Sequence, residues 1–582
     1  MMNFNGTRGH RFAESPVLQL RLPAWRSRLM ALLILACFAV LIGRSFYLQI
    51  LNNEFLQEKG ESRYRRTLEI PASRGRIFDR NGDVLAISTP MKSVWAIPAD
   101  ARLTPEQTKQ LASLLEMNVK DLTRKLASDK SFVYLRRELP PDIGDRIAAL
   151  KLPGIGQDKG YRRYYPSGEM TAHLVGFTGV DDKGLEGVEL AFQNQLFGRV
   201  GSRTVIKDRR GQIVEDVGSI EPPQDGRDIR LAIDSKIQYL AYSYLKQAVA
   251  DYKAKAGGVV VVDALSGEIL ALANWPTYNP NNRERLSGAQ LRNRALTDTY
   301  EPGSVMKPFT AALALENGKV GFNTIIDCSP GKLTIGSATI SDAHPHGKLT
   351  VAEVIQKSSN VGTAKIAGAL SPQQMWDMFD AVGFGRAPQL GFPGEANGRL
   401  RPWKSWRPIE QVTMSYGHGI SVSLMQMAQA YTVFAREGEL MPLTLTRLEA
   451  LPLASKQVFS TQTVQEVRTM LEMAVQPGGT APKARVPGYR VAGKTGTAYK
   501  VEGGQYARKY VASFVGFAPV SAPRLIVAVM IDEPGGRAYY GGDVAGPVFS
   551  GVMGGALRTL GIAPDAPVQI ANQEAVAMKE KM

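Results

Sequence analysis

The chain has 582 residues, of which 44% are hydrophobic and 21% charged, a globular composition that excludes wholesale disorder. A chain of this length is too long for one hydrophobic core and should divide into several domains. Lysine and arginine outnumber aspartate and glutamate by 70 to 54, and the resulting net charge of +16 favours an anionic partner. The sequence contains no zinc-finger spacing and no aromatic RNA-binding motif, so we do not expect nucleic acid to be that partner.

An apolar run near the N-terminus predicts a membrane anchor at residues 29–51, with Arg44 near its end. Arginines dominate residues 1–28, and this excess predicts a cytoplasmic tail with the remaining chain exported. A cleaved signal peptide and a lipoprotein site at Cys37 are alternatives. No small-x-small cleavage motif follows the run, and the run continues past Cys37, so we favour an uncleaved anchor.

Residues 52–228 predict a non-catalytic module. An Asn-Gly turn inside RGRIFDRNGDVLAI predicts a β-hairpin in which Arg76–Phe78 pairs with Val84–Ile87. Residues 104–150 have a helical pattern, and the segments that follow are short, extended and rich in glycine and arginine. A Pro-Pro pair followed by a polar stretch indicates a boundary near residue 228.

Residues 229–565 predict an α+β domain. A long amphipathic helix at residues 231–252 precedes two buried strands within 257–274, and two more apolar strands follow at 512–520 and 524–532. Helical segments fill the centre. Because strands from both ends enclose helices, we expect one antiparallel sheet closed by the two ends of the segment. Residues 566–582 read as a flexible tail.

The segment TYEPGSVMKPF carries a candidate nucleophile and base. Ser304 and Lys307 are three residues apart and follow a Pro-Gly pair, which predicts that both lie on one face at the start of a helix. A neutral lysine there could accept the serine proton. A second Ser-x-x-Lys match, Ser329 to Lys332, contains Pro-Gly between the two residues and therefore reads as a turn.

Two further motifs follow in a defined order. Ser358-Ser359-Asn360 lies downstream of the nucleophile, and Lys494-Thr495-Gly496 lies further on, which completes the order S-x-x-K, S-x-N, K-T-G. In an acyl transfer, Ser304 would attack and Lys307 would take its proton. Ser358 would relay a proton to the leaving group, while Asn360 would hold Lys307 and the substrate amide.

The third motif would bind the substrate. Lys494 adds positive potential for a substrate carboxylate, and Gly496 would let the strand edge approach the ligand. Lys307 must be neutral to act as a base, so we expect Lys494 and partial burial to lower its pKa.

These motifs resemble those of class B penicillin-binding proteins, which are peptidoglycan D,D-transpeptidases, and within them the cell-division type. RGRIFDRNG (74–82), GLEGVE (184–189) and DRRG (208–211) resemble non-catalytic motifs of this family, and NRALTDTYEPGS (293–304) resembles the division type around its nucleophile. The resemblance implies a transpeptidase domain, an antiparallel sheet with a helical subdomain, on an elongated β-rich pedestal with one transmembrane helix. YGHG at 416–419 departs from the family at His418, for which we expect a packing role.

The resemblance also implies a site and a substrate. Backbone N–H groups of Ser304 and Thr497 would form the oxyanion hole, Thr495 and Thr497 would bind the substrate carboxylate, and Ser359 and Gly496 would also belong to the substrate site. The donor would be a stem peptide ending in D-Ala-D-Ala, held as an ester on Ser304 and passed to an amine of a neighbouring peptide in septal cell wall. β-Lactams would mimic the donor, and no cofactor is implied.

Partners and location follow from the same resemblance. The protein would be a single-pass protein of the bacterial inner membrane, with its catalytic domain in the periplasm beside a membrane-embedded glycosyltransferase and other division proteins. A β-lactamase or D,D-carboxypeptidase, and a division component without turnover, are the rival hypotheses. His344 and His346 lack further ligands at metal spacing, so we expect no metal site. Tyr539 and Tyr540 could be a wall of the cleft or an exposed turn.

Overall fold

The computed structural model describes residues 24–51, 65–207, 213–216, 221–451, 455–536 and 538–567. It contains two units, one formed by Met1–Ile70 with Val200–Pro222 and the other by Pro71–Arg199 with Pro223–Met582. The expected tail from residue 568 onward lies outside the described residues, as do residues 1–23 of the cytoplasmic segment and the DRRG motif.

The first unit contains the apolar helix. Helix α1 (Ala24–Phe46) continues into one π-helical segment, η2 (Tyr47–Leu51), and Ala24–Gln49 is long and apolar enough to cross a membrane. The helix therefore begins five residues before the expected anchor. The Arg44 guanidinium lies over the Tyr47 ring, 5.4 Å from its centroid, so the charge near the end of the run has an aromatic partner. Strands β1 (Arg65–Ile70), β6 (Gly201–Lys207) and β7 (Ile213–Asp216) form an antiparallel sheet in the order β1-β6-β7.

In the second unit, the pedestal begins with the predicted hairpin. Strand β2 (Ile77–Phe78) pairs antiparallel with β3 (Val84–Ala96), with Ile77 opposite Ala86. Strand β3 also pairs with β4 (Val133–Leu139) and β5 (Ile155–Tyr164). The expectation of helix throughout 104–150 is wrong in its middle, because the alternating VYLRREL segment pairs with β3 as a strand. The helices of the pedestal are α3 (Pro105–Leu114), α4 (Val119–Leu126), α5 (Pro141–Ala149), α6 (Ala172–Val175), α7 (Gly187–Ala191) and α8 (Gln193–Leu196).

The catalytic part is built on the predicted antiparallel sheet. Five strands lie in the order β10-β9-β21-β20-β19, and β19 is an edge strand. Their bounds are β9 (Ala256–Asp263), β10 (Ile269–Trp275), β19 (Ala492–Glu502), β20 (Gln505–Ala518) and β21 (Leu525–Asp532). Both ends of the segment therefore contribute to one sheet, as the apolar strand patterns predict.

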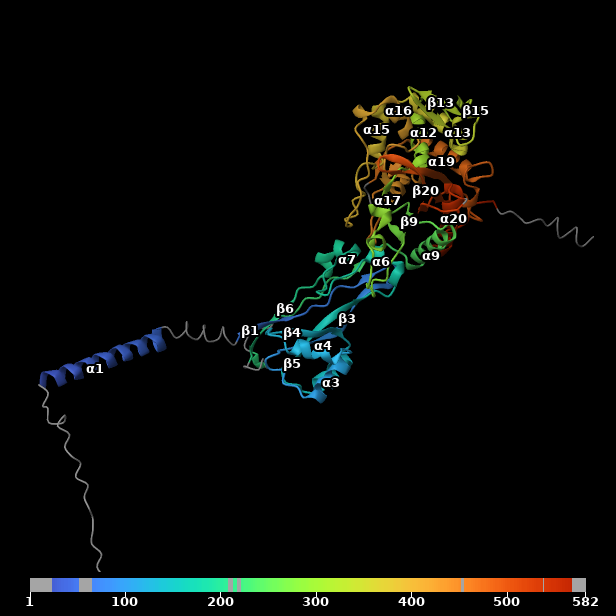
Figure 1. Cartoon of the computed structure of the whole chain (residues 1–582). Helices are drawn as coiled ribbons and strands as arrows, with labels where there is room; N and C mark the ends of the chain where they lie inside the picture. The colour runs from blue at the N-terminus through green and yellow to red at the C-terminus, as the bar shows by residue number, and fades with distance from the viewer. Residues whose placement is uncertain are drawn as a thin grey trace, which may run out of the picture. The chain divides into compact units, whose positions relative to one another are not determined.

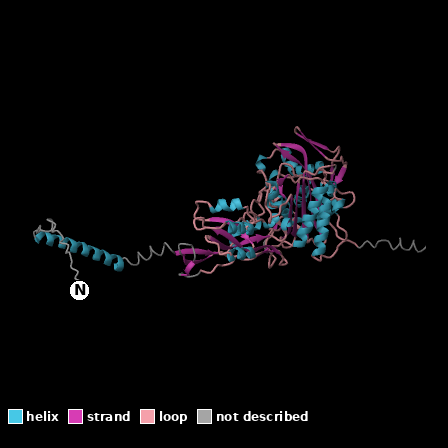
Figure 2. Ribbon diagram, turned by 60° about the horizontal axis from the view of Figure 1, so that its bottom comes forward, coloured by secondary structure: helices cyan, strands magenta, loops and turns pink. Residues whose placement is uncertain are grey.

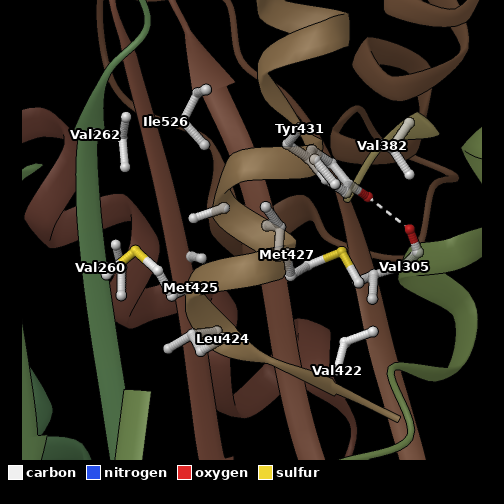
Figure 3. Packing of buried hydrophobic residues seen from close by; sticks show 14 of the residues in the cluster. Val260, Val262, Val305, Val382, Val422, Leu424, Met425, Met427, Tyr431 and Ile526 are labelled. Atoms are coloured by element: carbon white, nitrogen blue, oxygen red, sulfur yellow. Dashed lines mark hydrogen bonds between the residues drawn. The ribbon is translucent and has the colours of Figure 1, made fainter. Parts of the chain in front are cut away.

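Both faces of this sheet are buried. On β9, Val259 and Val261 pack into one hydrophobic core with helices α9 (Ser235–Asp251) and α20 (Gly541–Thr559), which Figure 1 shows beside β9 and β20. Val260 and Val262 alternate to the opposite face, where they join a second core that includes α17 (Leu424–Ala430) (Figure 3). The all-valine run is therefore consistent with a strand that has no solvent-exposed face.

The helical subdomain lies between β10 and β19 in the chain, and helices α12, α13, α15 and α16 gather at one end of the catalytic part (Figure 1). Both parts of the unit contain helices and strands (Figure 2). The remaining helices are α10 (Gly288–Leu291), α11 (Arg294–Thr297), α12 (Lys307–Glu316), α13 (Val351–Lys357), α14 (Asn360–Gly368), α15 (Pro372–Ala381), α16 (Pro408–Met414), α18 (Thr432–Ala435) and α19 (Thr461–Val475). The short strands are β8 (Ile229–Arg230), β11 (Thr299–Tyr300), β12 (Ile325–Asp327), β13 (Lys332–Ile335), β14 (Ala338–Ser341), β15 (Lys348–Thr350), β16 (Val422–Ser423), β17 (Glu439–Leu440) and β18 (Lys456–Gln457).

Candidate active site

The candidate nucleophile Ser304 lies on a tight turn, Gly303–Met306 (the nucleophile turn), before a buried helix. Gly303–Met306 forms one 3-10 turn that leads into α12, with Gly303 at a φ of 60°, which favours glycine. The Tyr431 hydroxyl donates a hydrogen bond of 2.9 Å to the Val305 carbonyl oxygen, and Figure 3 shows this bond reaching the turn from the buried core. Because Tyr431 is fully buried, this hydrogen bond fixes the backbone between Ser304 and Lys307 from the side of the hydrophobic core.

Lys307 is completely buried and bonds to the second motif. Its Nζ atom donates to the Ser358 carbonyl oxygen at 2.5 Å and to Asn360 Oδ1 at 2.8 Å, and it lies 3.2 Å from Ser358 Oγ. Burial, followed by the positive charge of Lys494, holds the Lys307 pKa well below its ordinary value. The direction and both causes agree with the sequence-based expectation, although the burial is complete rather than partial.

The left-handed backbone conformation of Ser358 orients the second motif toward Lys307. Ser358 ends α13 with a φ of 61° and a ψ of 40°, a conformation that non-glycine residues rarely adopt. This turn presents both the carbonyl oxygen and the hydroxyl of Ser358 to Lys307. Asn360 then begins α14, and its side-chain amide also donates to the Ser341 carbonyl oxygen at 2.9 Å. An amine with two N–H groups bound in this way keeps one lone pair available as a base.

Sequence reasoning missed Asp342. Its carboxylate accepts hydrogen bonds from the backbone N–H groups of Asn360 and Val361, at 2.5 and 3.0 Å, and from the Ser359 hydroxyl at 2.7 Å. A carboxylate at the N-terminus of a helix satisfies N–H groups that lack intrahelical partners. Asp342 therefore fixes the start of α14, and with it Asn360. No spacing rule connects Asp342 to the S-x-N motif, since the contact is tertiary.

Ser359 differs from its expected place in the substrate site. Its side chain is buried, its hydroxyl donates to Asp342, and the same oxygen accepts from the Gly362 N–H at 2.8 Å as the cap of α14. The hydrogen-bonding groups of the Ser359 hydroxyl are thus satisfied within the protein. We reassign Ser359 from substrate binding to positioning.

The third motif lies on the edge strand. Lys494 is completely buried, and burial lowers its pKa to about 7. Its Nζ atom contacts Thr495 Oγ1 at 3.2 Å, and this hydroxyl in turn donates to Thr480 Oγ1 at 3.1 Å. The Thr497 hydroxyl accepts from the Gly541 N–H at 3.0 Å, which links the motif to the start of α20. These hydroxyl groups are the ones expected to face a carboxylate.

Gly496 has a packing reason that differs from the expected one. A Cβ atom at this position would lie 2.4 Å from Ser513 Oγ and 2.7 Å from the Pro302 carbonyl oxygen. The position without a side chain therefore admits the segment that carries the nucleophile, rather than a ligand. It brings the nucleophile turn against β19, with the Ser304 and Thr497 backbones on adjacent elements.

Aromatic residues border the nucleophile turn. The His418 ring packs edge-on against Tyr416 and Tyr506, with centroids 5.2 and 6.0 Å away, and burial lowers its pKa to about 4. His418 is therefore neutral near pH 7, in agreement with a packing role. Tyr539 stacks on Tyr510 of β20, with centroids 4.3 Å apart, and also contacts Tyr540, so these rings cover the β19–β20 hairpin.

Two sequence patterns remain: the second Ser-x-x-Lys match and the possible metal site. Ser329 lies in a turn before β13, as the internal Pro-Gly predicts, so the second Ser-x-x-Lys match does not form a helical face. Among the residues that the structure describes, no group of three or more His, Cys, Asp or Glu side chains could hold a metal ion.

Comparison with known proteins identifies the family. Residues 257–554 match the penicillin-binding protein transpeptidase domain, and residues 69–231 match the penicillin-binding protein dimerisation domain. The chain is 45% identical to a probable peptidoglycan D,D-transpeptidase PenA of Neisseria gonorrhoeae, which covers 93% of this chain and 94% of that protein. It is 41% identical to the peptidoglycan D,D-transpeptidase FtsI of Escherichia coli K12, with 93% of each covered.

A solved structure agrees with this assignment. The transpeptidase domain of penicillin-binding protein 3 from Burkholderia pseudomallei is 52% identical and matches with a TM-score of 0.54, covering 58% of this chain and 98% of that one. This chain belongs to the penicillin-binding protein family whose members carry a transpeptidase domain. The resemblance inferred from the three motifs is confirmed, as is the N-terminal helix that fits a single-pass membrane anchor.

Proposed function

We propose that this protein is a serine D,D-transpeptidase that crosslinks stem peptides of septal peptidoglycan and is a target of β-lactams. One observation carries the proposal: a fully buried lysine, three residues after a serine on a tight turn, is held by Ser358 and Asn360 with its pKa well below the ordinary value. A lowered pKa favours the neutral amine, which is the form of lysine that can act as a base. The names of the related proteins support the choice of reaction.

The first half-reaction forms the acyl-enzyme. The Ser304 hydroxyl attacks the carbonyl carbon between the two terminal D-Ala residues while neutral Lys307 takes the hydroxyl proton. Backbone N–H groups of Ser304 and Thr497 stabilise the oxyanion. The C–N bond breaks, and the leaving D-Ala amine receives a proton through Ser358, which contacts Lys307. Lys494 and the hydroxyl groups of Thr495 and Thr497 hold the terminal carboxylate.

The second half-reaction reverses the roles. An amine of a neighbouring stem peptide attacks the ester carbon, Lys307 takes a proton from this amine, and the Ser304 oxygen leaves and is reprotonated. A new amide bond replaces the ester, so no cofactor is needed. β-Lactams resemble the donor and would leave a long-lived ester on Ser304, because we assign no residue that activates water against it.

The location follows from the anchor. The arginine excess before α1 favours a cytoplasmic N-terminus and a periplasmic catalytic domain. A membrane-embedded glycosyltransferase and other division proteins would be its partners, since crosslinking requires nascent glycan at the membrane. If the anchor acts only as a tether, an unrelated membrane helix of equal length should restore growth to cells that lack the native chain. Failure of this swap would indicate that the helix itself binds a partner.

Intact mass spectrometry of the full chain with and without penicillin tests the function. We expect one adduct per chain, mapped to Ser304, persistent for many minutes, and absent from Ser304→Ala. An adduct on Ser329, or labelling of Ser304→Ala, would overturn the assignment of the nucleophile. Rapid release of hydrolysed penicillin would favour a β-lactamase, and no adduct would favour a division component without turnover.

A further inference from the structure

The loop that follows α19, residues 476–481, lies between the second and third motifs. Lys357, the residue before Ser358, donates from Nζ to the Gly478 carbonyl oxygen at 2.9 Å. On the other side, a Cβ atom at Gly542, near the start of α20, would lie 2.2 Å from the Thr480 carbonyl oxygen. Because Gly542 has no side chain, α20 admits this loop, and Thr480 lies within hydrogen-bond distance of β19.

Thr480 is connected to Lys494 through a single hydroxyl group. Among the described residues, the Lys494 Nζ atom has two acceptors, the hydroxyl oxygen of Thr495 at 3.2 Å and its carbonyl oxygen at 3.4 Å. A hydroxyl group has one proton to donate, and Thr495 donates it to Thr480 Oγ1 at 3.1 Å. With this proton directed at Thr480, the lone pairs of the Thr495 oxygen are left to face the ammonium group.

The orientation of this hydroxyl matters because Lys494 is completely buried. Burial lowers its pKa to about 7, whereas hydrogen bonds accepted from the ammonium form act in the opposite direction. Without Thr480, the Thr495 hydroxyl could rotate and turn its proton toward Lys494. The lysine would then lose the nearer of its two acceptors and would deprotonate at a lower pH.

No ionised group among the described residues takes over this task. The elements packed against β19 are β20, α19, α20 and the nucleophile turn, and Lys307, directly after that turn, is a cation coupled to Lys494. Strand β20 has its charged residues and tyrosines at residues 506–510, whereas Val515 lies opposite Lys494. The charged residues of α19 and α20 have other partners or lie in the last turn: Glu466 with Gln462, Arg468 with Glu437, Glu472 with Arg490, Asp543 with Lys483, and Arg558 in the last turn.

We propose that Thr480 is a positioning residue of the carboxylate site, which holds the Thr495 hydroxyl so that its oxygen faces Lys494 and keeps this lysine charged near neutral pH. The inference rests on the proposed transpeptidase function and refines it. Thr495 then serves the substrate carboxylate through Lys494. The Thr497 hydroxyl, whose oxygen accepts from the Gly541 N–H, has no acceptor among the described residues and keeps its proton for the carboxylate.

The kinetics of penicillin adduct formation by the full-length protein in detergent test this role. Rates measured against penicillin concentration give the apparent dissociation constant before acylation, and its dependence on pH gives the midpoint at which Lys494 loses its charge. Thr480→Val keeps the shape of the side chain but cannot accept a hydrogen bond. Its midpoint should fall by about half to one pH unit, as expected for one hydrogen bond, and its dissociation constant at pH 7 should rise about 2- to 5-fold.

Further variants separate the hydroxyl from the packing of the loop. Thr480→Ser keeps the acceptor and should restore the parental midpoint, and Thr480→Ala should repeat the shift of Thr480→Val. In a Thr495→Val background, Thr480→Val should cause no additional shift, because Thr480 acts only through the Thr495 hydroxyl. Thr469→Val, on the exposed side of α19, is the control and should keep the parental midpoint. Melting temperatures check that each variant folds.

A parental midpoint in both Thr480→Val and Thr480→Ala, a shift that persists in Thr480→Ser, or an additional shift in the Thr495→Val background would overturn the inference. Equal weakening of the uncharged penicillin methyl ester would do so too, because it would indicate a disturbed loop. Failure of the function itself is distinguishable, since the unaltered chain would then form no adduct on Ser304. A chain that forms the adduct with an unmoved midpoint would be a transpeptidase whose Lys494 is supported by other groups.

Discussion

Two lysines are completely buried in this site, and their surroundings suit them to different tasks. Lys307 touches two strong acceptors and lies near the charge of Lys494, whereas the pKa of Lys494 is lowered by burial alone, to about 7. Burial penalises the ammonium form of both. The lowered pKa of Lys307 suits it to the proposed role of base, whereas Lys494, with a pKa of about 7, is still partly charged at neutral pH and can attract an anion.

Replacing the base should abolish acylation. Lys307→Met keeps most of the side-chain length but removes the amine, so the rate of acylation by penicillin should fall by about 10²- to 10⁴-fold. The measurement is the second-order rate constant for the mass adduct, with the melting temperature as a check on folding. Lys365→Met, on the exposed side of α14, is the control and should react at the parental rate. A parental rate for Lys307→Met would mean that another group is the base.

Substrate affinity should weaken as the pH rises through about 7. Below this pH, Lys494 is protonated and attracts the carboxylate of penicillin, and above it the charge is progressively lost. The apparent dissociation constant for penicillin before acylation should therefore increase between pH 6 and 8, because the span is centred on that pKa of about 7. The uncharged methyl ester of the same penicillin is the control and should lack this dependence.

His418 should not be the group that titrates in this range. Its pKa of about 4 means that its ring is already neutral. His418→Gln should therefore preserve the loss of affinity, and its disappearance in this variant would assign the transition to the histidine instead of Lys494.

Asp342 should act through position and charge. Asp342→Asn retains one oxygen acceptor but replaces the other with an amide that cannot accept from Ser359 or the α14 N–H groups, so acylation should slow by roughly 10-fold, corresponding to about one charge-assisted hydrogen bond. The Asp342 charge also raises the Lys307 pKa. Its removal should therefore shift the acidic limb of the acylation profile to lower pH.

The control for this substitution is Asp327→Asn. Asp327 lies in the same subdomain, and its carboxylate caps a turn by accepting from the Ser329 N–H at 2.9 Å. We expect this variant to keep the parental profile. A slower rate for Asp342→Asn with no shift of the acidic limb would reduce Asp342 to a purely structural role.

At the scale of elements, the apolar strands were predictable and the polar ones were not. Val259–Val262 and the runs that form β20 and β21 predict buried strands, and the structure places them in one sheet. Strand β19 was recognised only as a motif, since AGKTGTA has neither strict alternation nor a long apolar run. Strand β4 was not predicted, because it lies in a segment with a helical pattern and its pairing with β3 is a tertiary contact.

The residues of the site likewise divide into those that the sequence predicts and those that it does not. Motif order predicts Ser304, Lys307, Ser358, Asn360 and Lys494. The structure brings Ser358 and Asn360 to the Lys307 amine and places Ser304 on the turn that precedes Lys307. The role of Asp342 and the inward-facing hydroxyl of Ser359 depend on how β14 leads into a loop beside α14. Neither can be read from spacing along the chain.

The approach of β19 to the nucleophile turn depends on Gly496. Gly496→Ala would place a methyl group against Ser513 Oγ and the Pro302 carbonyl oxygen, so the turn or the strand must move. We expect a loss of about 1–3 kcal/mol of unfolding free energy, typical of overpacking, and slower acylation because Ser304 and Thr497 separate. Gly347→Ala, where a methyl group meets no atom within 4 Å, should change neither quantity.

Denaturant unfolding and the acylation rate together check this prediction. A Gly496→Ala protein with parental stability and rate would show that the contact is relieved elsewhere. Lower stability with an unchanged rate would separate packing from the geometry of the oxyanion hole.

At the scale of the whole molecule, the pedestal hairpin is tied to the catalytic part. The Arg80 N–H donates to the Ile233 carbonyl oxygen at 2.9 Å, and Asn81 Nδ2 donates to Asp234 Oδ2 at 3.0 Å. Strand β8, at the boundary expected near residue 228, pairs in parallel with β2 of the hairpin. All three contacts lie within the second unit, so the predicted module and the catalytic domain share a continuous framework there.

The central activity proposed for the full chain is the transfer of a donor peptide from Ser304 to an amine. The most direct measurement is a product analysis with a synthetic donor ending in D-Ala-D-Ala and an acceptor peptide carrying a free amine. Our account predicts release of one D-Ala for each crosslinked product, and neither product from Ser304→Ala. Release of D-Ala with hydrolysed donor alone would identify a carboxypeptidase, and crosslinking by Ser304→Ala would contradict the account outright.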